Sequence, residues 1–314
     1  MSNQQLQQVP VVWLQGASCS GCSVSLLNSA APRIANVLLE ELVPGKHVQV
    51  VFHPTIMAAS GQVALEILHD TEQRSGGYVL ILEGGLPEKV PYIGGTTDDG
   101  EEISLLDCFT DLAANAIAVV AVGSCAAFGG VPAAAPNPSG CKTASEVLAE
   151  RGVATPVVNV SGCPPHPDWI VGTLVHLMLN GVPKPDDLDD WGRPRAFFGS
   201  LIHENCPRRA DFDAGKFATH HGEPGCLYEL GCKGPLTYSD CPLRQWNSGI
   251  SWPIGAGSPC LGCVEPGFPD VGSGLYEKIS ACQLPRLEAD PKTGRLRYVA
   301  PWLNRTEAHE CQGQ

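Results

Sequence analysis

The sequence predicts an α/β fold, with a doubly wound parallel sheet in the first part of the chain and a smaller, irregular domain in the second. Short apolar runs rich in β-branched residues alternate with amphipathic segments as far as Asn180. Beyond Asn180, Gly, Pro and Cys recur too often for long regular elements. The 314 residues are 43% hydrophobic, which is enough to fill a sizeable core.

The expected strands are near-continuous apolar runs, as found in parallel sheets that helices cover on both faces. They are Val11–Gly16, Val48–Phe52, Tyr78–Leu82, Ile117–Val122 and Val157–Val160. Helical patterns follow or precede them at Val24–Leu42, Gly61–Glu72, Leu105–Ala116, Ala144–Arg151 and Asp168–Leu179. Strands and helices in alternation predict a doubly wound sheet.

The first domain is expected to cover residues 1–182 and the second residues 183–314. The Pro- and Asp-rich segment Gly181–Arg195 marks the change in composition. The chain after it cannot bury enough apolar area to fold by hydrophobic collapse alone. We therefore expect bound metal to stabilise the second domain.

Charge and hydropathy argue against a nucleic-acid partner and against a transmembrane segment. The chain has 33 acidic and 20 basic side chains and a net charge of −13, which argues against binding to a nucleic acid. No apolar run approaches the roughly 20 residues that span a bilayer, and Met1–Pro10 lacks the features of a secretory signal. We expect a cytoplasmic protein with no transmembrane segment; peripheral association with a membrane, or export with a partner that carries a signal, stays open.

Four of the fourteen cysteines follow the ends of expected strands. Cys19 and Cys22 follow the first strand, Cys125 the fourth and Cys163 the last. Because ligands of open parallel sheets bind at the strand ends, these thiols are expected to converge. Glycines that would let the backbone approach a bulky group stand beside them, at Gly16, Gly21, Gly123 and Gly162. Four such thiolates suit either a 4Fe–4S cluster or a tetrahedral zinc.

Two further sets of ligands lie in the second domain. His203, Cys206, Cys226 and Cys232 form a set of one imidazole and three thiols, which zinc would accept as well as iron. Another set has three thiols and no evident fourth ligand: Cys241, Cys260 and Cys263. A structural zinc site uses four ligands, whereas a 3Fe–4S cluster needs only three thiolates, so this set favours iron.

The cysteine motifs occur in the order CxxC, GSC, GCPP, HxxC, two further Cys and C…CxxC. This order resembles that of the small, electron-transferring subunit of nickel–iron hydrogenases over nearly the whole chain. The resemblance implies a flavodoxin-like first domain with a proximal 4Fe–4S cluster, and a second domain with a medial 3Fe–4S and a distal 4Fe–4S cluster. It assigns the first set of four cysteines to the proximal cluster, the His-containing set to the distal cluster and the three-thiol set to the medial cluster.

The resemblance also implies how the chain works. Hydrogen would be split at a nickel–iron centre in a separate large subunit, bound at the proximal-cluster face in a heterodimer or a dimer of heterodimers. Electrons would then pass through the proximal, medial and distal clusters to an acceptor near His203. Pro253 matches the proline that stands where the medial site lacks a fourth cysteine. Gly21 and Gly130 occupy positions where some oxygen-tolerant members carry extra cysteines, and the short polar tail argues against membrane attachment through this subunit.

Three alternatives stay open at this point. The complex could be a hydrogen sensor that signals to a kinase, which turnover with artificial acceptors would test. The chain could be a structural zinc protein, against which the three-thiol set argues. The small cluster-bearing subunit of respiratory complex I is also similar, but only over the first half, and the adjacent cysteines common in that subunit are absent here.

The remaining candidates are expected to be structural. Cys108 is expected in the core, and Cys141, Cys282 and Cys311 as unliganded packing or surface thiols. His166 and Trp169, in PPHPDW, are expected to pack near the site rather than to bind metal. Glu83, in LILEGG, is expected to be an exposed or backbone-bonded carboxylate with no catalytic role.

Overall fold

The computed structural model describes residues 7–73, 77–96, 99–271, 274–280, 284, 286–289 and 296–299. The chain divides into two compact units, Met1–Ala196 and Phe197–Gln314. The segment that follows the expected boundary at residue 182 pairs with the first unit. The backbone N–H of Asn159 donates to Gly192 O (2.9 Å), and its side-chain amide donates to Trp191 O (2.7 Å).

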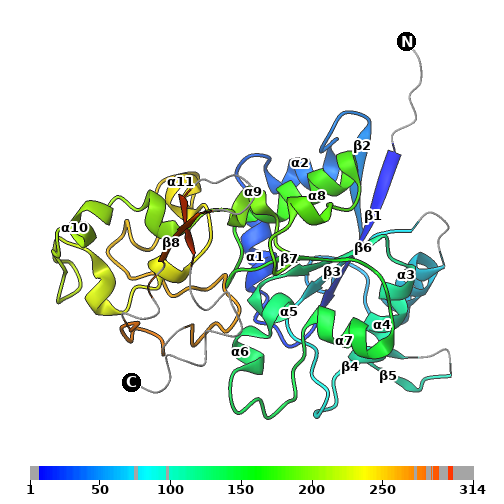
Figure 1. Ribbon diagram of the computed structural model, residues 1–314. Helices are drawn as coiled ribbons and strands as arrows, with labels where there is room; N and C mark the ends of the chain where they lie inside the picture. Colours follow the sequence, from blue (N-terminus) through cyan, green and yellow to red (C-terminus); the bar gives the residue numbers. More distant parts are fainter. Residues whose placement is uncertain are drawn as a thin grey trace. The chain divides into compact units, whose positions relative to one another are not determined.

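A five-stranded parallel sheet forms the centre of the first unit (Figure 1). Its strands are β1 (Gln7–Gln15), β2 (Lys46–Phe52), β3 (Val79–Glu83), β6 (Ala118–Val122) and β7 (Val157–Val160). They lie in the order β2-β1-β3-β6-β7, and every neighbouring pair is parallel. Counted in chain order, this is the 2-1-3-4-5 arrangement of flavodoxin-like folds. The predicted fold class is confirmed.

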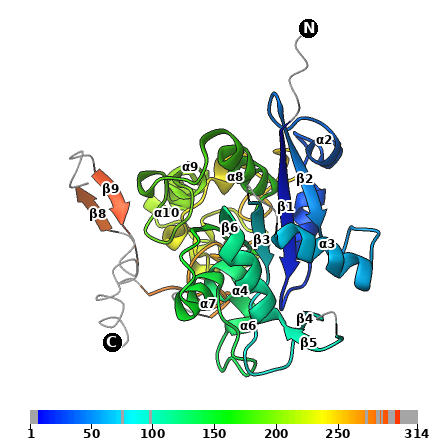
Figure 2. The same cartoon turned by 90° about the vertical axis from the view of Figure 1, so that its right-hand side faces the viewer.

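Helices pack against the sheet on both faces (Figure 2). They are α1 (Gly21–Leu27), α2 (Ile34–Leu39), α3 (Gln62–Glu72), α4 (Leu105–Asn115), α5 (Ser124–Phe128), α6 (Gly130–Ala133), α7 (Ala144–Arg151) and α8 (Pro167–Asn180). Helix α1 contacts α8, and α4 contacts both α3 and α7. A two-stranded antiparallel ribbon, β4 (Ile93–Thr96) with β5 (Glu102–Ser104), precedes α4 and was not expected from the sequence.

The single helix predicted over Val24–Leu42 is wrong. Helix α1 ends at Leu27, and α2 begins only at Ile34. Pro32 lies between them, and proline has no N–H to donate within a helix. The Ser29 hydroxyl instead donates to Pro32 O (2.7 Å). The break leaves α1 as a short helix that belongs to the turn after β1.

The core of the first unit lies between the sheet and helices α4 and α7. All residues of β3 and β6 are buried, as their apolar sequences predict. Phe109 and Leu112 of α4 and Leu148 of α7 belong to the same apolar cluster. Cys108 is also buried in this cluster, so its expected place in the core is confirmed. Cys141 is a buried packing thiol, whereas Cys282 and Cys311 lie outside the described residues.

The second unit consists mainly of turns and very short helices. Helix α9 (Arg195–Phe198) contains the division between the units, and after it come the turns η2 (Ile202–Asn205), η3 (Leu227–Leu230) and η4 (Gly234–Leu236) and the helices α10 (Arg209–Asp213) and α11 (Cys241–Arg244). A hairpin, β8 (Arg286–Ala289) with β9 (Leu296–Val299), comes last. The turn η1 (Pro185–Asp187) lies before this unit. Within the described part of the chain, no helix is long and apolar enough to cross a membrane.

Candidate metal sites

The first candidate site lies beyond the carboxyl ends of strands β1, β6 and β7. Cys19 lies between β1 and α1, Cys22 lies in the first turn of α1, Cys125 lies on α5 after β6, and Cys163 follows β7. Burial raises the pKa of the Cys22 thiol well above its usual value, and charge on Glu83, Cys125, Cys163 and Cys19 raises it further. The connections that carry these cysteines meet, because a Cβ at Gly123 would lie 2.6 Å from Cys22 Sγ and Ser124 N–H donates to Gly162 O (2.9 Å).

Two of the four expected glycines face the thiols. A Cβ at Gly123, whose φ is +91°, would lie 2.6 Å from Cys22 Sγ, and a Cβ at Gly21 would lie 3.1 Å from Cys19 Sγ. The other two serve backbone packing instead, because a Cβ at Gly16 would meet Gly85 O at 2.2 Å. A Cβ at Gly162 would likewise meet Pro165 Cα at 2.5 Å. The space in front of the thiols is kept clear by Gly21 and Gly123.

The donor set fits an iron–sulfur cluster. Each protein ligand of such a cluster binds its own iron, so the four thiolates surround a volume rather than a point. Cys19 and Cys163 are exposed, whereas Cys22 and Cys125 are partly covered. Two of the four thiols are thus open to solvent, and the protein partly shields the other two.

Glu83, at the end of β3, is not exposed, but it does accept backbone hydrogen bonds, which was the other expectation for it. Its side chain is buried at 1% exposure, and Oε1 accepts hydrogen bonds from the backbone N–H groups of Cys22 (3.0 Å) and Ser23 (3.3 Å). Its other oxygen, Oε2, accepts from three side chains: Trp13 Nε1 (2.9 Å), Gln15 Nε2 (2.9 Å) and Ser23 Oγ (2.5 Å). The carboxylate therefore fixes the turn that carries Cys22.

The hydrogen bonds decide the charge of Glu83. Burial alone would raise the pKa of this carboxyl group, but bonds from Gln15, Ser23 and Trp13 outweigh burial and leave the pKa below its usual value. The group is an ionised carboxylate in the core of the first unit. A carboxylate that ends a fully apolar strand and precedes two glycines, as in LILEGG, is the sequence signal for this role.

His53 continues this polar network away from the thiols. Burial lowers the pKa of His53, and the nearby Glu83 opposes this effect only in part. Thr55 N–H donates to His53 Nδ1 (3.3 Å), so the neutral ring carries its proton on Nε2, which lies 3.2 Å from Ser23 Oγ. The ring also packs on Trp13, with 5.0 Å between ring centroids. Sequence analysis missed this histidine because it stands alone after β2.

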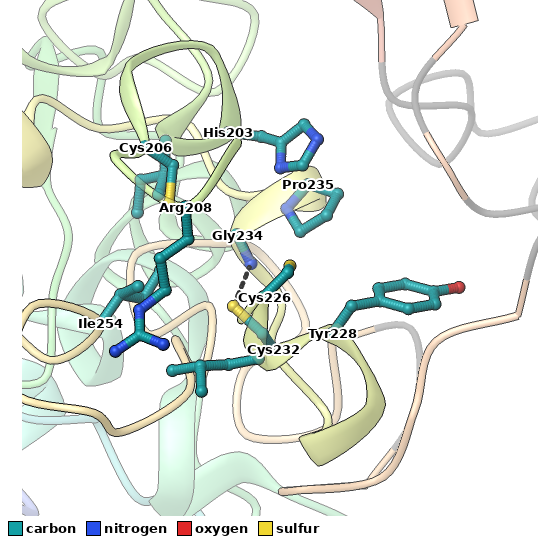
Figure 3. Close-up of a pocket in the computed structure, with 11 residues that line it drawn as sticks. His203, Cys206, Arg208, Cys226, Tyr228, Cys232, Gly234, Pro235 and Ile254 are labelled. Atoms are coloured by element: carbon teal, nitrogen blue, oxygen red, sulfur yellow. Dashed lines mark hydrogen bonds between the residues drawn. The ribbon is translucent and has the colours of Figure 1, made fainter. Parts of the chain in front are cut away.

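The second candidate site is a small pocket in the second unit (Figure 3). His203, Cys206, Cys226 and Cys232 all line it, as do Arg208 and Tyr228. Burial lowers the pKa of His203 to about 4, so its imidazole is neutral, the form that binds metals. The backbone N–H of Gly234 donates to Cys232 Sγ (3.4 Å), the dashed contact in Figure 3. The structure brings the four predicted ligands of this set together.

The third set is also gathered within the second unit. Burial raises the pKa of Cys260 well above its usual value, and charge on Cys232, Cys263 and Cys241 adds to the effect. Cys260 N–H donates to Cys232 Sγ (3.4 Å), which links the third set directly to the second. Pro253 is exposed between the buried Trp252 and Ile254, and its role as the empty fourth corner stays a prediction.

His166 and Trp169 have the packing roles that were expected. His166 precedes α8, and its Nδ1 accepts the N–H of Asp168 (3.0 Å), which satisfies a free donor of the first helical turn. Both side chains are buried, with their ring centroids 5.8 Å apart. They support the turn after Cys163.

Comparisons with known proteins cover both units. Residues 198–276 match the family described as the C-terminal part of the NiFe/NiFeSe hydrogenase small subunit. Residues 19–177 match the family described as NADH ubiquinone oxidoreductase, 20 Kd subunit. The second match is confined to the first unit, which agrees with the partial similarity to complex I noted from the sequence.

Whole-length relatives are similar over most of the chain. The periplasmic [NiFeSe] hydrogenase small subunit of Desulfomicrobium baculatum is 44% identical over 282 residues, covering 86% of this chain and 87% of the relative. The periplasmic [NiFe] hydrogenase small subunit of Solidesulfovibrio fructosivorans is 41% identical over 278 residues, covering 85% and 81%. A structure of the reduced, active Ni-Fe-Se hydrogenase from Desulfomicrobium baculatum matches with a TM-score of 0.80 and 44% identity, over 87% of this chain and all of the matched chain.

Proposed function

Because the chain belongs to the family of NiFe and NiFeSe hydrogenase small subunits, we propose that it conducts electrons between a nickel–iron centre in a partner large subunit and an acceptor. The chain is thus one subunit of a hydrogenase, an oxidoreductase. The observation that carries the proposal is that the three connections of the sheet that carry Cys19, Cys22, Cys125 and Cys163 meet at Gly123 and Gly162. Packing alone does not require four thiols at one sheet edge.

We assign the three ligand sets to three clusters. The four strand-end thiols would hold a proximal 4Fe–4S cluster; His203, Cys206, Cys226 and Cys232 a distal 4Fe–4S cluster; and Cys241, Cys260 and Cys263 a medial 3Fe–4S cluster. Clusters bound there would take up and release one electron at a time. The chain's own residues keep the thiols in place and largely out of water, and Glu83 holds the Cys22 turn. In this proposal electrons pass through the sites in the order proximal, medial and distal.

Exposed apolar side chains beside the first site support a large-subunit interface there. Val24 (54% exposed) and Leu27 (43%) lie on α1, the helix that carries Cys22. Val131 (56%) lies on α6, next to Gly130, whose Cβ position is 3.1 Å from Cys125 Sγ. Apolar groups exposed together commonly mark protein interfaces. We propose that this face binds the large subunit, which would supply the nickel–iron centre and the hydrogen chemistry.

The cellular location is a separate proposal. Sequence analysis favours a cytoplasmic chain, whereas the relatives from Desulfomicrobium baculatum and Solidesulfovibrio fructosivorans are named periplasmic. Fractionation of cells that produce the native complex decides between the two compartments. Recovery of the complex with periplasmic markers would overturn the cytoplasmic prediction.

The test of the proposed function is purification of the chain with its large subunit. We expect about 11 iron atoms in this subunit, from two four-iron clusters and one three-iron cluster. The complex should reduce an artificial dye with hydrogen, whereas the isolated chain should show no turnover. Stoichiometric zinc with little iron, or hydrogen turnover by the isolated chain, would contradict the proposal.

A further inference from the structure

Lys233 is a fully buried basic residue between two ligand sets. It follows Cys232, a proposed distal ligand, and its side chain is 0% exposed. Lysine is almost never fully buried unless its ammonium group has partners. Lys233 Nζ donates to the backbone carbonyl groups of Gly274 (3.2 Å) and Glu277. The charged end is therefore held by dipoles inside the second unit.

The backbone of Lys233 also joins the proposed distal and medial sites. Its N–H donates to the carbonyl oxygen of Cys260, a proposed medial ligand (2.7 Å). Cys260 N–H in turn donates to Cys232 Sγ (3.4 Å). Lys233 thus lies in a closed loop of contacts that contains one ligand of each site.

Lys233 adjoins one ligand of each site, because it follows Cys232 in the chain and its N–H donates to Cys260 O. Burial lowers the pKa of Lys233, whereas charge on Glu277, Cys232 and Cys260 acts in the opposite direction. Of these charges that of Glu277 acts most strongly on Lys233, although its side chain is exposed and water and salt screen it in part. A charge inside the protein is screened much less, and its effect on neighbouring buried groups is correspondingly larger.

We propose that Lys233 is an electrostatic positioning residue shared by the medial and distal clusters, and that its positive charge raises the reduction potentials of both. This inference rests on the proposed function, because it requires clusters in both sites. Reduction adds negative charge to a cluster, and a nearby cation stabilises the reduced form. One lysine beside two neighbouring sites would shift both potentials in the same direction.

A purely structural role is the competing explanation. The two hydrogen bonds from Nζ tie the segment 274–280 to the ligand-bearing turn, and their loss would loosen this segment without changing a potential. Substitutions that separate charge from hydrogen bonding distinguish the two roles. Lys233→Met keeps the apolar stem and removes the charge, Lys233→Gln keeps an N–H donor without charge, and Lys233→Arg keeps the charge.

The experiment is a redox titration of the intact complex with its large subunit, followed by electron paramagnetic resonance. The medial cluster is observed in its oxidised state and the 4Fe–4S clusters in their reduced states. We expect the medial and distal potentials to shift to more negative values in Lys233→Met and Lys233→Gln, and to stay near those of the unmodified complex in Lys233→Arg. The proximal potential should not change.

Lys278→Met is the matched control. Lys278 lies in the same 274–280 segment, but its side chain is 45% exposed and forms an ion pair with Glu229 (2.6 Å). Its removal changes the net charge equally, and we expect no shift in any potential, since the charge is screened by water. Equal shifts in Lys278→Met and Lys233→Met would overturn the assignment to Lys233.

The outcomes separate this inference from the proposed function. Absence of the cluster signals from the unmodified complex would refute the proposed function. Full iron content with unchanged medial or distal potentials in the neutral variants would refute the role of Lys233 alone. Loss of clusters from Lys233→Met and Lys233→Gln, but not from Lys233→Arg, would support a requirement for the charge. Loss of clusters from all three variants would assign Lys233 to packing and overturn the proposal.

Discussion

Replacement of Glu83 by Gln tests whether the buried carboxylate holds the turn of the first site. The change keeps size and shape but turns one acceptor oxygen into an N–H donor. If the new amide oxygen accepts from the N–H groups of Cys22 and Ser23, the new NH₂ group takes the place of Oε2. It then faces the side-chain donors of Trp13, Gln15 and Ser23 and cannot accept their hydrogen bonds. Ser23 can rotate its hydroxyl and Gln15 can turn its amide, but the indole N–H of Trp13 has no alternative.

The magnitude follows from that unsatisfied group. A buried donor without a partner costs about 1–3 kcal/mol, and the bonds that remain lose the extra strength given by a charged acceptor. Removal of a buried charge offsets part of this loss, so we expect a destabilisation of roughly 3 kcal/mol. In a unit of this size, each kcal/mol of lost unfolding free energy lowers the melting temperature by about 2–4 °C. We therefore expect a melting temperature that is lower by about 6–12 °C.

Thermal unfolding of the intact complex, with iron analysis of the same samples, measures this effect. Glu88→Gln is the control, since Glu88 is half exposed and pairs with Lys142 at the surface (2.8 Å). Its melting temperature should differ by less than about 2 °C, as expected for a surface ion pair. A Glu83→Gln complex within the same 2 °C, with full iron content, would refute the argument that Glu83 stabilises the ligand turn.

The other predictions concern the ligand sets themselves. Cys22→Ser should remove about four iron atoms per chain, because a hydroxyl is a poor substitute for a thiolate. Cys108→Ser, in the core, is the control and should keep its iron. Equal iron loss in the two variants would contradict the assignment of Cys22 as a ligand. Gly123→Ala should lower iron content because its Cβ would lie 2.6 Å from Cys22 Sγ. Gly152→Ala is the control, because Gly152 has φ +70° and open space around its Cβ position, so that this variant carries backbone strain alone. A similar iron content in the Gly123→Ala and Gly152→Ala variants would contradict the role given to Gly123. Pro253→Cys should convert a three-iron into a four-iron cluster, so the paramagnetic signal of the oxidised complex should disappear, and a strong unchanged signal would show that Pro253 is not the fourth corner.

Much of the first unit could be predicted because its sheet is buried on both faces. β3 and β6 are buried along their whole length, so their sequences are continuous apolar runs that only a covered strand explains. The thiols of the first site could be placed for the same reason, since each follows such a run. The helix over Val24–Leu42 was mispredicted because its apolar periodicity outweighed the break that Pro32 makes.

The roles of Glu83 and His53 could not be predicted from spacing. Both side chains depend on partners from distant segments, and Trp13 contacts each of them. A single polar residue carries no periodic signal. The second unit posed a different problem. Among its described residues after Phe197 no helix exceeds five residues, so periodicity had nothing to detect, and only the cysteine spacing indicated which segments meet.

The hydrogen bond from Cys260 N–H to Cys232 Sγ affects how the second unit assembles. When Cys232 Sγ binds the distal cluster, its hydrogen bond also restrains the backbone of Cys260, a medial ligand. Filling one site therefore reduces the conformational entropy that the other site still loses when it fills. We therefore expect the medial and distal sites to fill cooperatively. Native mass spectrometry of chains matured with limiting iron should then show empty and fully loaded second units, with few half-loaded ones, whereas independent sites would give a statistical mixture.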